Sequence, residues 1–352
     1  MKEKKVRRSD NMRNSSIELL RIIAMIGVVI LHYNNGQIGG GFQYVSDGSI
    51  NQAFLFFSES LFIGSVNLFV MISGYFLCKT KTRRIIKVVE LLVQVVVFSE
   101  VFYILRVLSG GEVFSIRELF VHLVPMNYFV VLYAVLYFIS PYLNMMIETL
   151  TKEKFQKLIL LLVVLFSVWT IGIDYLESFL NLSLTGASTV GCYGSQSGYT
   201  IVNFVLMYII GAYIGRYGVS IEKGKNLIYI LINLLLVFGL SYGEHLLGNG
   251  AIVTWNYNHP LIISFAALVL IFVTKYSFES RVVNELAKGA FTCFLFHTAC
   301  LSFMRIPLVV NKGVPILIFH QVMVSVCLYL ISYVIYKIYS LCTGWIFKRI
   351  QL

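Results

Sequence analysis

The chain has 352 residues, of which 58% are hydrophobic and only 13% are charged, and its formal net charge is +11. A soluble globular domain carries about 25% charged residues, so this composition excludes a soluble protein and predicts an all-α, polytopic integral membrane protein. The basic excess is explained better by membrane topology than by nucleic acid, so we expect a lipid bilayer and no nucleic acid among the partners. The six cysteines form no CxxC pair, and we expect neither a disulfide framework nor a metal site.

About ten apolar segments long enough to cross a bilayer follow one another along the chain. The first follows a basic stretch and has no small-residue cleavage site after it, which predicts an uncleaved span rather than a signal peptide. The predicted spans are 17–33, 54–77, 88–107, 126–147, 158–173, 200–215, 226–242, 260–274, 289–304 and 314–340. We therefore expect one membrane domain over residues 17–340, between a basic cytoplasmic tail at 1–16 and a second cytoplasmic tail at 341–352.

Lys and Arg are distributed unevenly between the two sides of this arrangement. The predicted outer loops hold only Arg106, Arg117, Arg305 and Lys312, and nearly all the other Lys and Arg of the 28 in the chain lie in the tails and inner loops. Cytoplasmic loops of membrane proteins carry such an excess. The pattern predicts that both termini face the cytoplasm.

The first predicted span, Ile17–Tyr33, contains Glu18, Arg21 and His32. A charged side chain at the centre of a membrane helix costs roughly 2.5–3.5 kcal/mol and usually faces a protein interior or a watery cavity. At 100° per residue, Arg21 and His32 lie on one stripe, roughly 16 Å apart along the helix axis. Glu18 precedes Arg21 by three residues and can pair with it. One helix therefore carries a basic anchor at its inner end and an imidazole that we expect near mid-depth.

This helix resembles the first helix of the membrane acyltransferase-3 family. That family has an acidic residue, then Arg or Lys, ten further residues and His, which Glu18, Arg21 and His32 match with Glu in place of the commoner Asp. Its Ser-Gly-Tyr turn is matched by Ser73, Gly74 and Tyr75.

The resemblance covers nearly the whole chain in its length and number of spans, and its specific motifs lie mainly in residues 17–90. The family's Arg-x-x-Arg motif is matched by Arg84 and Lys87, with Arg83 beside them, although Lys lacks the bidentate fork of Arg. Its aromatic helix is matched by Asn127-Tyr128-Phe129, and its late Tyr-Leu-x-His element by Phe294-Leu-Phe-His297.

The resemblance implies a ten-helix enzyme of the bacterial plasma membrane that acylates cell-surface glycans. We expect an O-acyltransferase, most readily an O-acetyltransferase, that uses a cytoplasmic thioester donor such as acetyl-CoA and holds no tightly bound cofactor. The acceptor would be a hydroxyl of a surface polysaccharide, for example an exopolysaccharide or capsule, or of its lipid-linked precursor.

Moving an acyl group to a hydroxyl needs a base for the hydroxyl proton, and an imidazole is the usual group. His32 can act as that base directly or can first take the acyl group itself. The alternative is a histidine that only packs or hydrogen-bonds between helices, and His297, which could face His32, has the same alternative. The resemblance favours the catalytic role for His32.

Several residues are candidates for binding the donor or lining the site. Arg83, Arg84 and Lys87 suit capture of the donor phosphates, but could equally be ordinary basic residues of an inner loop. Arg21 could reach a phosphate or position the base, and its alternative is a purely structural pair with Glu18. The predicted lining residues are Ser73, Tyr75, Glu90, Tyr128 and His297. Glu59 and Glu100 are further intramembrane acids without an assigned role.

Other classes of membrane protein remain as competing interpretations. A glycan exporter or flippase is the main one, but it should show internal repeats or paired broken helices, and the sequence shows neither. A glycan polymerase would need larger outer loops, and an anchor or sensor half of a larger enzyme would need a soluble partner domain.

Overall fold

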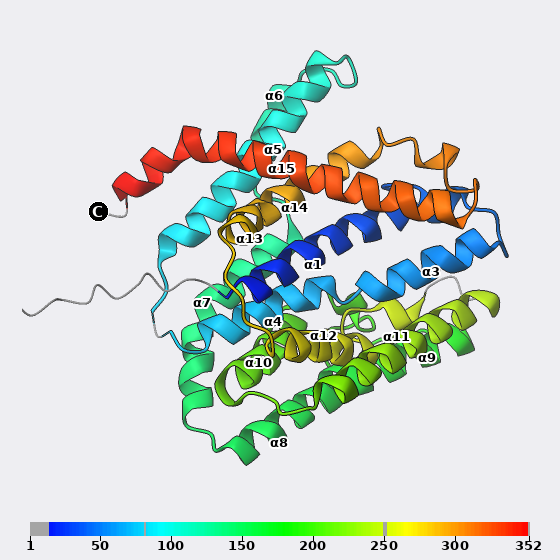
Figure 1. Ribbon diagram of the computed structural model, residues 1–352, viewed down its shortest axis with the longest axis vertical. Coiled ribbons are helices and arrows are strands. Elements are labelled where there is room, and N and C mark those ends of the chain that lie inside the picture. The colour runs from blue at the N-terminus through cyan, green and yellow to red at the C-terminus, as the bar shows by residue number, and fades with distance from the viewer. Residues whose placement is uncertain (1–13, 81, 249–251, 351–352) are drawn as a thin grey trace, which may run out of the picture.

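The computed structural model describes residues 14–80, 82–248 and 252–350, so most of the predicted N-terminal tail and the last two residues of the C-terminal tail lie outside the described residues. The described chain is helical throughout and contains no strand (Figure 1). The α-helices are α1 (Ser15–Asn34), α2 (Gly41–Tyr44), α3 (Ile50–Phe62), α4 (Ser65–Leu77), α5 (Ile85–Leu108), α6 (Ile116–His122), α7 (Tyr128–Glu148), α8 (Lys152–Val163), α9 (Trp169–Leu180), α10 (Ile201–Tyr217), α11 (Lys223–Leu246), α12 (Pro260–Val273), α13 (Arg281–Leu286), α14 (Ala290–Leu301) and α15 (Val314–Ile350).

Eight helical segments of the described chain are long and apolar enough to cross a membrane. They are Ser15–Asn34, Ile50–Leu77, Ile85–Leu108, Tyr128–Glu148, Lys152–Leu180, Lys223–Leu246, Val253–Val273 and Val314–Phe347. The predicted all-α, polytopic membrane fold is therefore confirmed. Two of the ten predicted spans coincide with the shorter helices α10 and α14, so the count of ten and the side of the termini remain predictions.

Two of the spans are interrupted helices. The predicted span 54–77 consists of α3 and α4, which meet at Ile63 and Gly64. The predicted span 158–173 is longer than expected, because α8 continues into α9 through a π-helical turn at Val164–Val168. Such turns often occur near functional sites, and here the buried Ser167 of the turn donates a hydrogen bond to the carbonyl of Asn258 at 2.6 Å.

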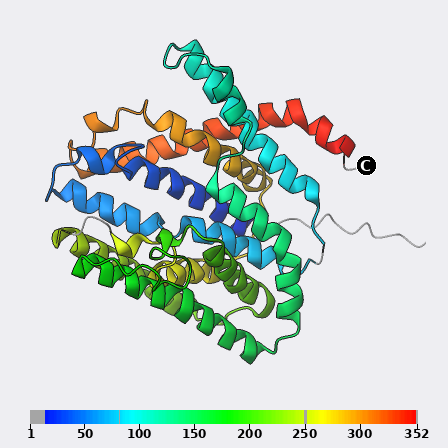
Figure 2. The ribbon, with the colours of Figure 1, turned by 180° about the vertical axis from the view of Figure 1, so that it is seen from behind.

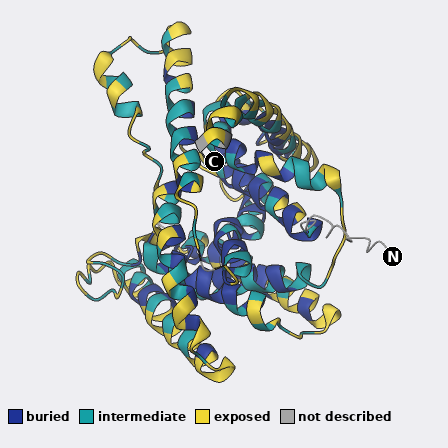
Figure 3. Ribbon diagram, turned by 90° about the vertical axis from the view of Figure 1, so that its left-hand side faces the viewer, coloured by how far each residue is buried: buried dark blue, intermediate teal, exposed yellow. Residues whose placement is uncertain are grey.

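The interior of the protein is built around α1 and the α3–α4 pair. In the most apolar 18-residue stretch of each of these two spans 72% and 78% of the residues are buried, against 22% in that of α8–α9. Figure 3 shows the buried ribbon gathered at the centre of the bundle, with exposed residues on the peripheral helices. Seen from behind, α5 and α7 lie in front of this centre, in cyan and blue-green (Figure 2). Because α1 is surrounded by protein, its polar side chains face other helices rather than lipid.

Helices α4 and α10 approach each other unusually closely, through glycine. A Cβ added at Gly74 would lie 2.1 Å from the carbonyl oxygen of Tyr208, and one at Gly211 would lie 2.0 Å from that of Met71. Gly211 and Gly215 form a small-xxx-small pair, the pattern that brings membrane helices together. The Gly of the Ser-Gly-Tyr motif is therefore a packing residue, and it fixes the position of Ser73 beside it.

Replacing Gly74 by alanine is expected to destabilise the protein by about 1–3 kcal/mol or more, because the backbone of α10 must move away. The measurement is the melting temperature of the detergent-solubilised protein. Gly172→Ala is the matched control, since no atom lies within 4 Å of the position of its added Cβ. Equal melting temperatures for the two variants would contradict the close packing.

Candidate active site

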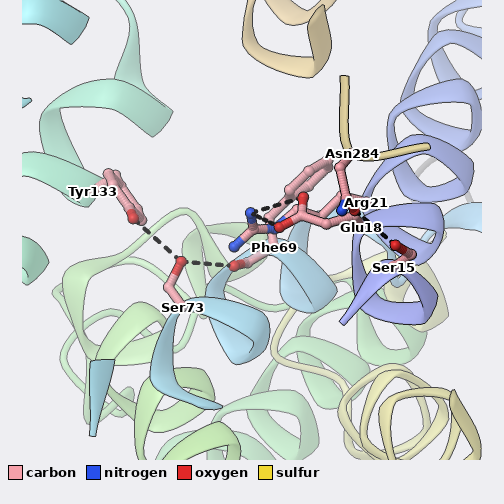
Figure 4. Close-up of polar contacts among 7 residues, drawn as sticks. All are labelled: Ser15, Glu18, Arg21, Phe69, Ser73, Tyr133 and Asn284. Atoms are coloured by element: carbon pink, nitrogen blue, oxygen red, sulfur yellow. Dashed lines mark hydrogen bonds and ion pairs between the residues drawn. The ribbon is translucent and has the colours of Figure 1, made fainter. Parts of the chain in front are cut away.

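The structure pairs the two charged residues at the start of α1, as predicted. Arg21 Nη1 lies 3.2 Å from both carboxylate oxygens of Glu18 (Figure 4). The Glu18 side chain is 3% exposed and that of Arg21 is 27% exposed. The guanidinium also lies over the ring of Phe76, 5.5 Å from its centre. Its Nε and Nη2 donate no hydrogen bond to any described residue, so Arg21 keeps donors for a ligand.

Arg21 lines a cavity of about 490 Å³. We call it the inner cavity because it lies at the predicted cytoplasmic end of α1. Five residues predicted from the sequence line it: Glu18, Arg21, Ser73, Lys87 and Glu90. Ser73 Oγ donates to the carbonyl of Phe69 at 3.0 Å and lies 3.2 Å from the hydroxyl of Tyr133 (Figure 4). The inner cavity thus combines two cations, two carboxylates and hydroxyl groups.

The three basic residues after α4 do not act as one cluster. The guanidinium of Arg83 donates to Ser140 Oγ and to the carbonyls of Leu77, Thr80 and Thr82. These bonds hold the end of α4 and the loop after it. Lys87 is exposed and lines the inner cavity, and Arg84 is exposed at the N-cap of α5. The geometry therefore gives Arg83 a structural task and leaves Lys87 and Arg84 available to a ligand.

Tyr75 lies away from the inner cavity, unlike its neighbour Ser73. Ser73, Phe76 and Leu77 share one face of α4 and line that cavity. Tyr75 is on another face, where its backbone oxygen lies 2.5 Å from the position of a Cβ added at Gly215 of α10. Tyr75 does not line the inner cavity, because the helical period carries the residue toward α10, and its place in the site remains a prediction.

His32 lies in the last turn of α1, three residues before the C-cap and not near the middle of the helix, and His297 of α14 faces it. The ring centres are 4.7 Å apart, and His297 Nε2 lies 3.1 Å from His32 Nδ1. His32 Nδ1 is also 2.9 Å from the carbonyl of Val28, and His297 Nδ1 is 2.8 Å from that of Cys293. Two histidines that are 265 residues apart in the chain therefore form one hydrogen-bonded pair.

The carbonyl partners decide which ring nitrogens carry hydrogen. A carbonyl oxygen only accepts, so Nδ1 of each neutral ring donates to the carbonyl four residues before it. His297 Nε2 is then an acceptor for the same Nδ1–H of His32. This arrangement leaves Nε2 of His32 with its lone pair available to take a proton or an acyl group.

His32 lines two adjoining cavities. The first, the histidine cavity, has a volume of about 250 Å³ and also contains His297 and Tyr128. The second, which we call the Glu59 cavity, has about 320 Å³ and contains Glu59, Asn256 and Trp255. Tyr199 and Tyr257 line both cavities. Tyr128 is thus placed beside the imidazole pair, as the sequence predicted.

An aromatic layer separates the histidine cavity from the inner cavity. Phe129 stacks on Tyr133 of the inner cavity, with ring centres 6.0 Å apart, and lies 5.3 Å from Phe294 of the histidine cavity. The two cavities share no lining residue within the described chain. The predicted site is therefore divided in two, and a ligand that joins Arg21 to His32 must pass Phe129.

A family model described as an acyltransferase domain matches residues 14–348, which is essentially the whole chain. The chain belongs to the acyltransferase-3 family. No curated protein and no solved structure matches it. The family and the apolar helices together make this protein a multi-pass membrane acyltransferase.

The contact between His297 and His32 in this acyltransferase leads to a prediction about how the imidazole of His32 is positioned. His297→Ala removes the acceptor that faces Nδ1 of His32, and we expect the rate of acyl transfer to fall roughly 10- to 100-fold, as when partners that orient histidine ligands are removed. The measurement is kcat for acyl transfer by purified protein. His297→Gln, which offers an acceptor oxygen, is expected to retain more activity than His297→Ala. Equal losses in both variants would contradict a positioning role.

Sequence reasoning assigned no role to Glu59, Tyr199, Trp255, Asn256 or Tyr257 in this acyltransferase. Four of the five lie in or beside predicted outer loops, where polar segments ordinarily face solvent. The dense pattern Trp255-Asn256-Tyr257-Asn258 was an available signal, because large aromatic side chains are costly to expose. What the sequence could not show is that this segment folds over His32.

Proposed function

We propose that this protein is an O-acyltransferase, most readily an O-acetyltransferase, of the bacterial plasma membrane. It would move an acyl group from a cytoplasmic acyl-CoA to a hydroxyl of a surface polysaccharide or its lipid-linked precursor. The observation that supports this most directly is His32, whose Nδ1 is held by Val28 and His297 and whose Nε2 is available between two cavities.

The reaction breaks the thioester C–S bond and forms an ester C–O bond. In the direct route, His32 Nε2 takes the proton of the attacking hydroxyl and passes it to the departing thiolate. In the covalent route, Nε2 attacks the thioester and expels the thiolate, and the acceptor hydroxyl then attacks the acyl-imidazole, with its proton passing to the thiolate. In both routes the imidazole becomes positively charged, and the neutral acceptor nitrogen of His297 stabilises that charge through Nδ1–H.

The inner cavity suits the donor. Arg21 and Lys87 can pair with phosphate oxygens, and the N-terminus of α5, capped by the backbone of Arg84, adds backbone N–H groups and a positive dipole end. We propose that Arg21, Arg84 and Lys87 contact the acyl-CoA donor. Arg83 instead stabilises the loop after α4. The long pantetheine arm would then run along α1 past Phe129 to place the thioester at His32.

The test compares surface glycan from wild-type, deletion and His32→Ala cells, with base-labile O-acyl groups measured by NMR. We expect the acyl groups to be absent from both mutants while the glycan still reaches the surface. A blot shows that the variant protein is inserted. Loss of the glycan itself from the surface of the deletion strain would instead favour an exporter or a polymerase.

A further inference from the structure

A further cavity adjoins the Glu59 cavity. This loop cavity, of about 520 Å³, is lined by Asp174, Glu177, Tyr193 and the backbone around Ser195. Ser197 and Asn256 line both the loop cavity and the Glu59 cavity. A row of adjacent cavities that share lining residues therefore extends from the imidazole to the predicted outer loops, at the end of α1 opposite to Arg21.

Glu59 is the unusual group in this row. It is 9% exposed, and one carboxylate oxygen accepts from Asn34 Nδ2 at 2.8 Å. Asn34 is held in turn by Gln321 of α15, whose Nε2 donates to it at 2.8 Å. The other carboxylate oxygen accepts no hydrogen bond and pairs with no cation in the described chain. A buried carboxylate left in this state is costly, so a ligand that donates hydrogen bonds would satisfy it.

The neighbours of Glu59 have the chemistry that recognises a sugar ring. Carboxylate and amide oxygens accept from hydroxyl groups, and Glu59 and Asn256 supply both kinds. The faces of Trp255 and Tyr199 carry the negative side of the aromatic quadrupole, against which the C–H face of a sugar packs. All four residues line the same cavity as His32.

The loops that form this row are held in place. The N–H of Tyr257 donates to the carbonyl of Ser197 at 2.9 Å, and Asn67 Nδ2 donates to the carbonyl of Tyr257 at 2.7 Å. Asp174 accepts from the N–H of Ser195 at 2.8 Å and from Asn256 Nδ2 at 2.7 Å. The carboxylate of Asp174 thus joins the two loops, and the row is built before a ligand arrives.

The charged side chains that line the loop cavity in the described chain are acidic. Asp174 and Glu177 contribute carboxylates, and no Lys or Arg lines the Glu59 cavity or the loop cavity in the described chain. Like charges brought together in an interface cost several kcal/mol. The row therefore discriminates against sugars that carry a carboxylate or phosphate.

We infer that the Glu59 and loop cavities together form the acceptor site, which binds an uncharged stretch of glycan. One sugar residue lies in the Glu59 cavity and presents a hydroxyl to His32, and its neighbour lies in the loop cavity. This inference rests on the acyl transfer proposed above. It adds the side from which the acceptor glycan enters, the residues that bind it and the requirement that it be uncharged.

The test measures acceptor kinetics with labelled acetyl-CoA and oligosaccharides cut from the glycan of the deletion strain, freed of esters with mild base. Glu59→Gln keeps an acceptor for Asn34 but loses the second carboxyl oxygen, and Trp255→Ala removes an aromatic face. We expect each to raise the KM for the oligosaccharide about 10- to 100-fold, as for the loss of a hydrogen bond to a charged group. The KM for acetyl-CoA, measured in the same assays, separates a loss of acceptor binding from a general loss of activity.

Glu100→Gln is the matched control, because Glu100 is another intramembrane glutamate and lies outside these cavities. An unchanged acceptor KM in Glu59→Gln and Trp255→Ala would overturn the inference, and so would an equal rise in the KM for acetyl-CoA. If the wild-type protein itself transfers no acyl group, the proposed function fails instead.

The charge of the acceptor is tested with the same oligosaccharides after oxidation of their primary hydroxyls to carboxylates. We expect the oxidised form to compete at least about tenfold more weakly than the neutral form. Equal competition, or a natural acceptor whose acylated residue is itself a uronic acid, would overturn the assignment to an uncharged glycan.

Discussion

Replacing His32 by alanine is expected to lower kcat for acyl transfer by about 10²- to 10⁴-fold, the usual contribution of a positioned acid–base group. The donor KM should change little, because the donor phosphates are assigned to the inner cavity, roughly 16 Å along α1 from the imidazole. The measurement is steady-state transfer from labelled acyl-CoA by purified protein. His245→Ala is the control, since His245 lies 3.2 Å from the exposed Asp47 and lines none of the cavities described above.

The same variant separates the two routes through His32. Wild-type protein incubated with labelled donor and no acceptor should become labelled if the acyl-imidazole forms, and His32→Ala should not. Absence of label from both proteins, with transfer lost in the variant, would leave the direct-base route. Transfer at the wild-type rate in His32→Ala would remove His32 from the mechanism.

Replacing Arg21 by glutamine is expected to raise the donor KM about 10- to 100-fold, because a charge-assisted contact to the donor is lost. It should also lower stability by about 1–3 kcal/mol, because the buried carboxylate of Glu18 loses its bond to Nη1. The measurements are donor kinetics and the melting temperature in detergent.

A second variant separates these two effects. Glu18→Gln combined with Arg21→Gln removes both charges, and such replacements of a buried pair are tolerated better than removal of one partner. We expect the double variant to recover stability while its donor KM stays high. Recovery of both quantities would show that Arg21 is only the structural partner of Glu18.

The sequence by itself determined the features that depend on local repetition. Composition and apolar length predicted the membrane fold, and the helical period placed Glu18, Arg21 and His32 on one face of α1. The contact of Glu18 with Arg21 spans three residues, so no knowledge of other helices was needed. The same motifs identified the family over most of the chain.

The tertiary structure decided which distant residues meet. His297 and Glu59 were visible in the sequence as intramembrane polar residues, but only helix packing places one against His32 Nδ1 and the other in a shared cavity. Arg83 looked like a phosphate contact, yet its donors are taken by loop carbonyls that become available only where α4 ends.

The predicted outer loops show most clearly that a local sequence pattern does not specify which distant segments meet. Nothing in the local pattern of Tyr199 or Trp255 specifies that these residues cover the imidazole, because their positions follow from contacts between segments far apart in the chain. Asn67 holds the carbonyl of Tyr257 across 190 residues. Helical periodicity is a property of neighbours and can be read along a sequence, whereas an active site assembled from five or more segments is a property of packing.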